Sequence, residues 1–125
     1  MIEDLGPNQI FIFGSNTAGV HAGGAAFLAK EKFGAEDGIG EGLTGRCYAF
    51  PTLDYRLGIP MVRRSTEALK RSRDKLYATA RALPEKQFLL TKVGCGIAGY
   101  KEADMQVLFV SAPENIVLPA DWQEV

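Results

Sequence analysis

The sequence has few of the residues that hold metals or form disulfides. Its 125 residues include one histidine, His21, and two cysteines, Cys47 and Cys95. Two cysteines are too few for a disulfide framework, and the histidine completes no familiar zinc-ligand spacing with them. We therefore expect no metal centre and no cofactor. The sparse use of cysteine favours a reduced, cytoplasmic setting.

Long apolar runs and a strong net charge are also missing. No stretch approaches the roughly 20 consecutive apolar residues of a membrane-spanning helix, and the acidic, turn-prone residues 1–7 are unlike a secretory signal. The net charge is −1, although residues 63–86 hold eight basic and three acidic side chains. This local excess is too small to predict nucleic acid as the partner. We expect a cytoplasmic protein that does not bind a membrane.

Glycine, in contrast, is abundant and clustered. The chain has 14 glycines, concentrated within residues 14–24, 34–45 and 94–99. The length and the hydrophobic content of 46% are those of one ordinary globular domain. We therefore expect a single domain over residues 1–125.

The pattern of apolar residues predicts alternating strands and helices. The continuous apolar run at 10–13 predicts a strand that is buried on both faces, as in a parallel sheet. We predict further strands at 46–50, 87–93 and 115–119, and helices at 25–33, 60–83 and 101–111. Pro60 is placed in the first turn of the long helix, Gly34 caps the first helix, and 34–45 is a flexible loop. This order predicts an α/β fold with a mostly parallel central sheet flanked by helices.

Two glycine-rich loops are candidates for ligand binding. Residues 14–24 and 94–100 each follow an apolar strand and precede a helix. Ligands of open α/β sheets bind at this end of the strands, where glycines and a helix N-terminus expose backbone N–H groups. The two loops therefore predict one cleft suited to a diphosphate, although such glycines also serve in plain tight turns. Neither loop has the P-loop or the Rossmann pattern.

Three segments resemble the macro domain family. They are Ile-Phe-Ile-Phe-Gly-Ser-Asn at 10–16 with Gly-Gly-Ala-Ala at 23–26, Tyr-Ala-Phe-Pro-Thr at 48–52, and Val-Gly-Cys-Gly-Ile-Ala-Gly-Tyr at 93–100. Their order agrees with the family over residues 10–110. The resemblance implies a macro-like three-layer sandwich that binds ADP-ribose or a related NAD-derived nucleotide. Some members hydrolyse ADP-ribosyl esters or a terminal phosphate.

The resemblance also implies the residues of the site. Asn16 would hydrogen-bond the distal ribose, Tyr100 would flank that ribose, and the second loop would wrap the diphosphate. The implied ligand-binding residues are Gly14, Ser15, Asn16, Gly23, Gly24, Thr52, Gly94, Cys95, Gly96, Ile97, Ala98, Gly99 and Tyr100.

Catalysis is a further possibility, and several side chains are candidates for it. Hydrolysis would use a water activated near Asn16, near His21 or by the phosphate of the substrate itself. His21 is a candidate general acid or base because an ordinary histidine titrates near neutral pH. His21 could equally do no more than shape the cleft. Cys95 at a strand end is a candidate nucleophile or a small packed residue, and Asp54 could orient a water or simply form a turn.

Two other functions stay open at the level of sequence. The same cleft could sense or sequester a nucleotide without turnover. Alternatively, the basic helix at 60–83 could bind a protein or nucleic-acid partner, although a basic run is usually the solvated face of an amphipathic helix. Hydrolysis and sensing would both involve a small-molecule partner that resembles ADP-ribose, and they differ in whether the ligand is turned over.

Overall fold

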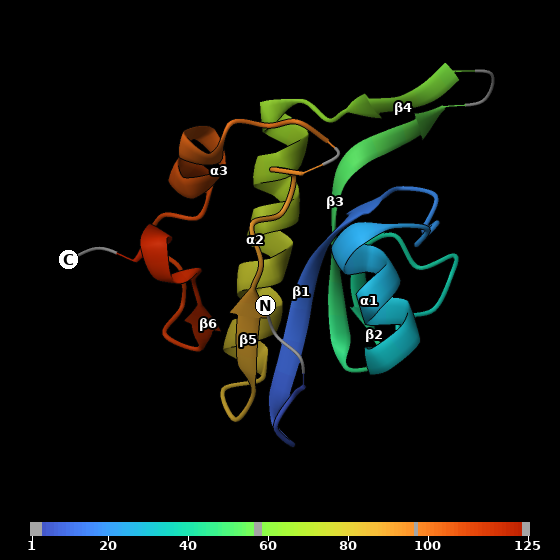
Figure 1. The fold of residues 1–125 in the computed structure, drawn as a ribbon. Helices are drawn as coiled ribbons and strands as arrows, with labels where there is room; N and C mark the ends of the chain where they lie inside the picture. Colours follow the sequence, from blue (N-terminus) through green and yellow to red (C-terminus); the bar gives the residue numbers. More distant parts are fainter. Residues whose placement is uncertain (1–3, 57–58, 97, 124–125) are drawn as a thin grey trace.

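The computed structural model describes residues 4–56, 59–96 and 98–123. Within these ranges six strands form one sheet in the order β2-β3-β1-β5-β6, and β4 pairs with β3 (Figure 1). Its pairings of β1 with β3, β1 with β5 and β5 with β6 are parallel. The strands are β1 (Gln9–Asn16), β2 (Gly42–Thr44), β3 (Cys47–Arg56), β4 (Ile59–Arg63), β5 (Gln87–Leu90) and β6 (Ile116–Val117).

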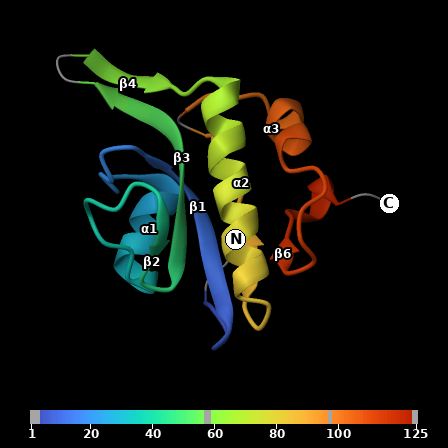
Figure 2. The same ribbon diagram turned by 180° about the vertical axis from the view of Figure 1, so that it is seen from behind.

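Helices cover both faces of this sheet. They are α1 (Gly24–Phe33), α2 (Thr66–Ala82), α3 (Glu102–Leu108) and a short 3-10 helix, η1 (Ala120–Trp122). Figures 1 and 2 show α1 on one side of the sheet and α2 on the other. One apolar cluster joins α1 to the sheet, and a larger one joins α2, α3 and Trp122 to the opposite face. The predicted α/β class with a mostly parallel sheet is therefore confirmed. Among the described residues, no helix is both long enough and apolar enough to span a bilayer.

The central strand β1 lacks polar alternation because both of its faces are buried. Phe11 and Phe13 pack in the cluster on the α1 side, whereas Ile10 and Ile12 pack in the cluster on the α2 side. Both faces are buried because parallel sheets in α/β folds are covered by helices on each side. This strand places Gly14, Ser15 and Asn16 at the carboxyl end of the sheet.

The predicted helix over 60–83 is wrong at its start. Residues 59–63 form β4, which pairs antiparallel with β3. A proline is tolerated there because β4 pairs with one strand alone among the described residues and leaves its other edge without a ladder. The helix begins at Thr66, where the Ser65 side chain caps it by accepting the Ala68 N–H at 3.1 Å.

The other boundaries differ in informative ways. The predicted loop at 34–45 contains β2, and β3 runs beyond the predicted end at residue 50 through Pro51 to Arg56. The register of β1 against β3 shifts next to Pro51. Proline has no backbone N–H to donate, and it is tolerated at such a bulge because the regular ladder of hydrogen bonds is interrupted there. The predicted cap of α1 is confirmed, because Gly34 is left-handed with φ 81°. The last three predicted elements are shorter than expected, since β5 ends at Leu90, α3 ends at Leu108 and β6 covers only 116–117.

Candidate functional site

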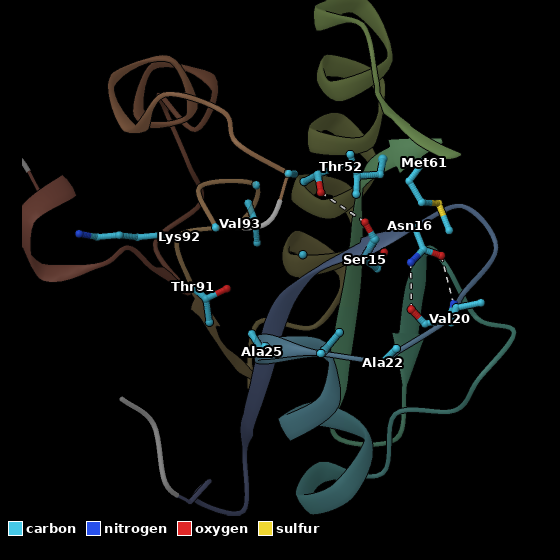
Figure 3. Close-up of a pocket in the computed structure, with 18 residues that line it drawn as sticks. Ser15, Asn16, Val20, Ala22, Ala25, Thr52, Met61, Thr91, Lys92 and Val93 are labelled. Carbon is cyan, nitrogen blue, oxygen red and sulfur yellow. Dashed lines mark hydrogen bonds between the residues drawn. The ribbon is translucent and has the colours of Figure 1, made fainter. Parts of the chain in front are cut away.

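A cleft of about 560 Å³ opens at the carboxyl ends of β1 and β5 (Figure 3). Its walls are the end of β1, the N-terminus of α1, residues 91–94, 96 and 98 after β5, and the paired strands β3 and β4. This position is where open α/β sheets bind ligands, and the volume lies within the usual range of ligand sites.

The first loop ends at an N-terminus of α1 that no side chain caps. Gly23 is the N-cap residue, it has no side chain to offer, and the first turn holds no acidic residue. Gly23, Gly24, Ala25 and Ala26 all line the cleft. The first N–H groups of a helix have no partner within the helix. These groups and the positive end of the helix dipole are therefore available to an anion in the cleft.

The second loop is folded tightly by its own backbone. The Gly99 N–H donates to the Gly96 carbonyl at 3.0 Å, and the Tyr100 N–H donates to the Gly94 carbonyl at 2.8 Å. Gly94 has φ 77°, and a Cβ there would lie 2.8 Å from the Tyr100 ring, so the position requires glycine. In the described ranges, the N–H groups of Gly94, Gly96 and Ala98 have no hydrogen-bond acceptor.

Two side chains hold this loop against β3 and β4 from outside. The Tyr100 hydroxyl lies 2.8 Å from the Thr52 carbonyl oxygen and 2.9 Å from that of Arg64, and its one proton is shared between them. The Arg63 guanidinium donates to the carbonyls of Ala98 and Gly99, both at 2.9 Å, and stacks on the Tyr100 ring. The loop conformation is thus fixed by contacts outside the cleft.

The polar side chains of the lining are also tied to the backbone. Asn16 donates from Nδ2 to the Val20 carbonyl at 2.9 Å and accepts the Val20 N–H on Oδ1 at 3.1 Å (Figure 3). Ser15 donates to the Gly40 carbonyl, Thr52 to that of Ser15 and Thr91 to that of Ile12. Asn16 keeps one amide proton and one acceptor lone pair for a ligand.

The described lining holds one ionisable side chain, Lys92, and its ammonium points away from the cleft (Figure 3). It lies 2.7 Å from both the Glu102 and the Asp121 carboxylates. These contacts raise the pKa of Lys92, and the Lys92 ammonium lowers the pKa values of both carboxyls. The electrostatic character of the cleft therefore comes from backbone dipoles rather than from charged side chains.

The structure brings most of the predicted site residues into this cleft. The predicted residues that line it are Gly14, Ser15, Asn16, Gly23, Gly24, Thr52, Gly94, Gly96 and Ala98. Cys95, Gly99 and Tyr100 belong to the second loop but are not among the residues that line the cleft. The prediction for Ile97 lies outside the described residues.

His21 does not lie in the cleft. Its ring is 2% exposed and packs edge-on against Phe13, with ring centroids 5.1 Å apart. Nε2 lies 2.9 Å from the Glu36 carbonyl oxygen, which can only accept, so Nε2 carries the proton. Nδ1 is buried and has no partner among the described groups. The ring therefore packs under the first loop, a position that fits the expected shaping role.

The two other ionisable candidates, Cys95 and Asp54, also lie outside the lining, whereas Asn16 lies in it. Burial raises the pKa of the Cys95 thiol, which favours the protonated, less nucleophilic form. The Asp54 carboxylate lies 3.3 Å from Arg64 Nε. Neither side chain faces the cleft.

Sequence reasoning missed the apolar wall of the cleft. Leu53 and Met61 line it from β3 and β4, and Val20 lines it from the first loop. The predicted helix over 60–83 includes Met61, whereas its pairing with β3 in β4 brings it to the cleft. The signal that could have located it is a strand at 59–63.

Comparisons of the chain with models of known protein families, with curated proteins and with solved structures give no match. The function must therefore be argued from the geometry of the cleft. In the described ranges, no group of three or more histidine, cysteine or acidic residues could hold a metal ion.

Proposed function

We propose that this chain is a macro-like three-layer domain that binds ADP-ribose or a closely related NAD-derived nucleotide in the cleft. One observation carries the proposal. The uncapped N-terminus of α1 lines the same cleft as Gly94, Gly96 and Ala98, whose N–H groups have no partner in the described ranges. Two sets of donors suit a diphosphate, whose two phosphates carry more oxygens than one set can serve.

The rest of the cleft suits the other parts of such a ligand. Asn16 lies beside the donors and keeps hydrogen-bonding capacity for ribose hydroxyls. The apolar wall of Leu53 and Met61 offers a surface for the flat base. The absence of a free cation in the described lining fits a ligand whose charge is met by oriented amides.

The lining favours binding without turnover over hydrolysis. A general acid or base must reach the reacting atoms, and the ionisable candidates His21, Cys95 and Asp54 lie outside the cleft. Hydrolysis would then depend on Asn16 and on the phosphate of the ligand itself. We therefore propose a sensing or sequestering domain as the function that this cleft serves best.

The test is a calorimetric titration with ADP-ribose, with AMP and NAD as comparison ligands. We expect a Kd for ADP-ribose near micromolar, or about −8 kcal/mol, and much weaker binding of AMP. Two matched variants localise the site. Ala22→Glu adds a negative charge to an exposed residue of the lining, and Ala103→Glu adds the same charge to an exposed residue of α3 outside it.

We expect Ala22→Glu to weaken ADP-ribose by at least about tenfold, because the added carboxylate opposes the diphosphate, and Ala103→Glu to leave the affinity unchanged. Equal affinities in both variants would place the ligand elsewhere. No heat for any of the three nucleotides would refute the proposal. Incubation with ADP-ribosylated protein then tests turnover, and release of ADP-ribose would refute the purely binding role.

A further inference from the structure

A second hollow lies on the other face of the sheet, between α2 and the turn that follows α3. It measures about 320 Å³ and is lined by Arg73, Asp74, Tyr77, Arg81, Val110 and Ser111. Figure 2 shows this side of the molecule, with α2 in front and α3 beside it. The cleft described above lies at the end of β1 and α1, so the two hollows share no residue.

An aromatic platform with two guanidinium groups forms this hollow. Arg73, Tyr77 and Arg81 are spaced four residues apart and share one face of α2. The guanidinium carbons of Arg73 and Arg81 lie 5.9 and 5.8 Å from the centre of the Tyr77 ring. The Tyr77 hydroxyl donates to the Val110 carbonyl at 2.9 Å, which fixes the ring against the turn.

The two guanidinium groups differ in what they bind. Arg73 donates to the Leu108 carbonyl and to the Asp74 carboxylate, each at 3.1 Å. Arg81 has no hydrogen-bond acceptor and no carboxylate among the described residues, and its described contact is the Tyr77 ring. Stacking orients a guanidinium while its edge N–H groups stay free, and this fork matches the oxygens of a phosphate.

The turn beside Arg81 adds further donors. Ser111 has φ 55°, an unusual backbone conformation for a residue other than glycine. Within the described part of the chain, its N–H and its hydroxyl have no hydrogen-bond partner. Ser111 is exposed, so both groups are accessible to a ligand in the hollow.

We propose that this hollow is a binding site for the phosphate group of a small molecule. The free edge of Arg81 takes two phosphate oxygens, and the Ser111 N–H and hydroxyl take a third. Arg73 contributes positive charge, which Asp74 partly offsets. The surplus of basic residues over 63–86 attracts the anion. This site is independent of the nucleotide proposed for the cleft.

The test is a titration of the ¹⁵N-labelled protein with inorganic phosphate up to about 20 mM at constant ionic strength, with acetate as the carboxylate comparison. We expect saturable amide shifts at Ser111 and along α2 near Tyr77, with a millimolar Kd and weaker shifts with acetate. Phosphate that enters the cleft shifts Gly24 and Gly96 instead, so the two sites are read separately.

Two substitutions on the same helix provide the decisive comparison. Arg81→Gln removes the free guanidinium, and Arg71→Gln removes the same charge from an exposed position outside the hollow. We expect Arg81→Gln to weaken phosphate at Ser111 about tenfold and Arg71→Gln to change it less than about twofold, the reduction expected from a more distant charge. Equal weakening by both variants, or no saturable shift at Ser111, would overturn the proposal. Unchanged circular dichroism verifies that both variants fold.

Discussion

Replacing Gly23 by aspartate tests the cleft at its most informative position. Gly23 is the N-cap of α1 with φ −159° and ψ 167°, an extended conformation open to any residue. It is exposed, so a side chain there has access to solvent. Aspartate would accept an N–H group of the first turn and place its carboxylate at the positive end of the helix. The same carboxylate would occupy the donors that we assign to the ligand.

The substitution should therefore stabilise the protein while it weakens the ligand. The cap itself contributes a few tenths of a kcal/mol relative to glycine, the helix dipole about 0.3–1 kcal/mol, and the loss of glycine freedom in the unfolded chain about 0.4–1 kcal/mol. Together they raise the free energy of unfolding by about 1–2 kcal/mol, which raises the Tm by about 3–8 °C for a chain of this size. ADP-ribose should bind at least about tenfold more weakly, a loss of about 1.4 kcal/mol.

Calorimetry measures both quantities on the same samples, by thermal unfolding and by titration. Gly23→Asn is the matched control, because it supplies a cap of similar geometry without the charge. We expect it to retain most of the gain in Tm and to lose less affinity than Gly23→Asp. A higher Tm with unchanged affinity in Gly23→Asp would refute the assignment of the α1 N-terminus to the ligand. A lower Tm would refute the capping argument itself.

Three other predictions concern the contacts around the cleft. Tyr100→Phe should cost about 1–2 kcal/mol of unfolding free energy in urea and weaken ADP-ribose severalfold, and unchanged values of both would mean that the hydroxyl does not hold the loop. His21→Ala should cost about 2–4 kcal/mol because it empties a buried site, yet the fraction that stays folded should bind ADP-ribose in the titration; intact stability would contradict the buried role. The Lys92 ammonium lowers the pKa values of the Glu102 and Asp121 carboxyls. The stability that these two ion pairs add is therefore present at neutral pH and is lost as the pH falls through the lowered pKa values. The urea stabilities of wild type and Lys92→Met should therefore converge in acid, and a constant difference down to about pH 2 would contradict this.

The parts of the fold that could be predicted from the sequence are those with a single strong local signal. The apolar run at 10–13 has no polar residue to present to water, so a strand buried on both faces is its best solution. Gly34 ends α1 because the C-cap has a left-handed backbone conformation, which glycine adopts without strain. The two glycine loops follow β1 and β5 as predicted, but β1 continues to Asn16, inside the predicted first loop, and β5 ends at Leu90, before the predicted strand end.

The errors arise where tertiary pairing outweighs the local pattern. Residues 59–63 contain a proline, which suits the first turn of a helix, and they precede the strong helical pattern of α2. Pairing with β3 nevertheless makes them a strand. His21 has the same kind of neighbours in sequence as a catalytic loop residue. Its burial depends on Phe13 and on Glu36, fifteen positions away. No pattern within the loop carries that information.

The chemistry of the cleft follows from the size of its residues. Glycine and alanine would let the proposed ligand approach the backbone closely, and they provide donors without adding charge. Such donors bind well only when they are held in place before the ligand arrives. Asn16 and Tyr100 provide that restraint, because each uses its polar group to fix a loop. We therefore infer that these side chains act mainly by holding the backbone that would recognise the proposed ligand.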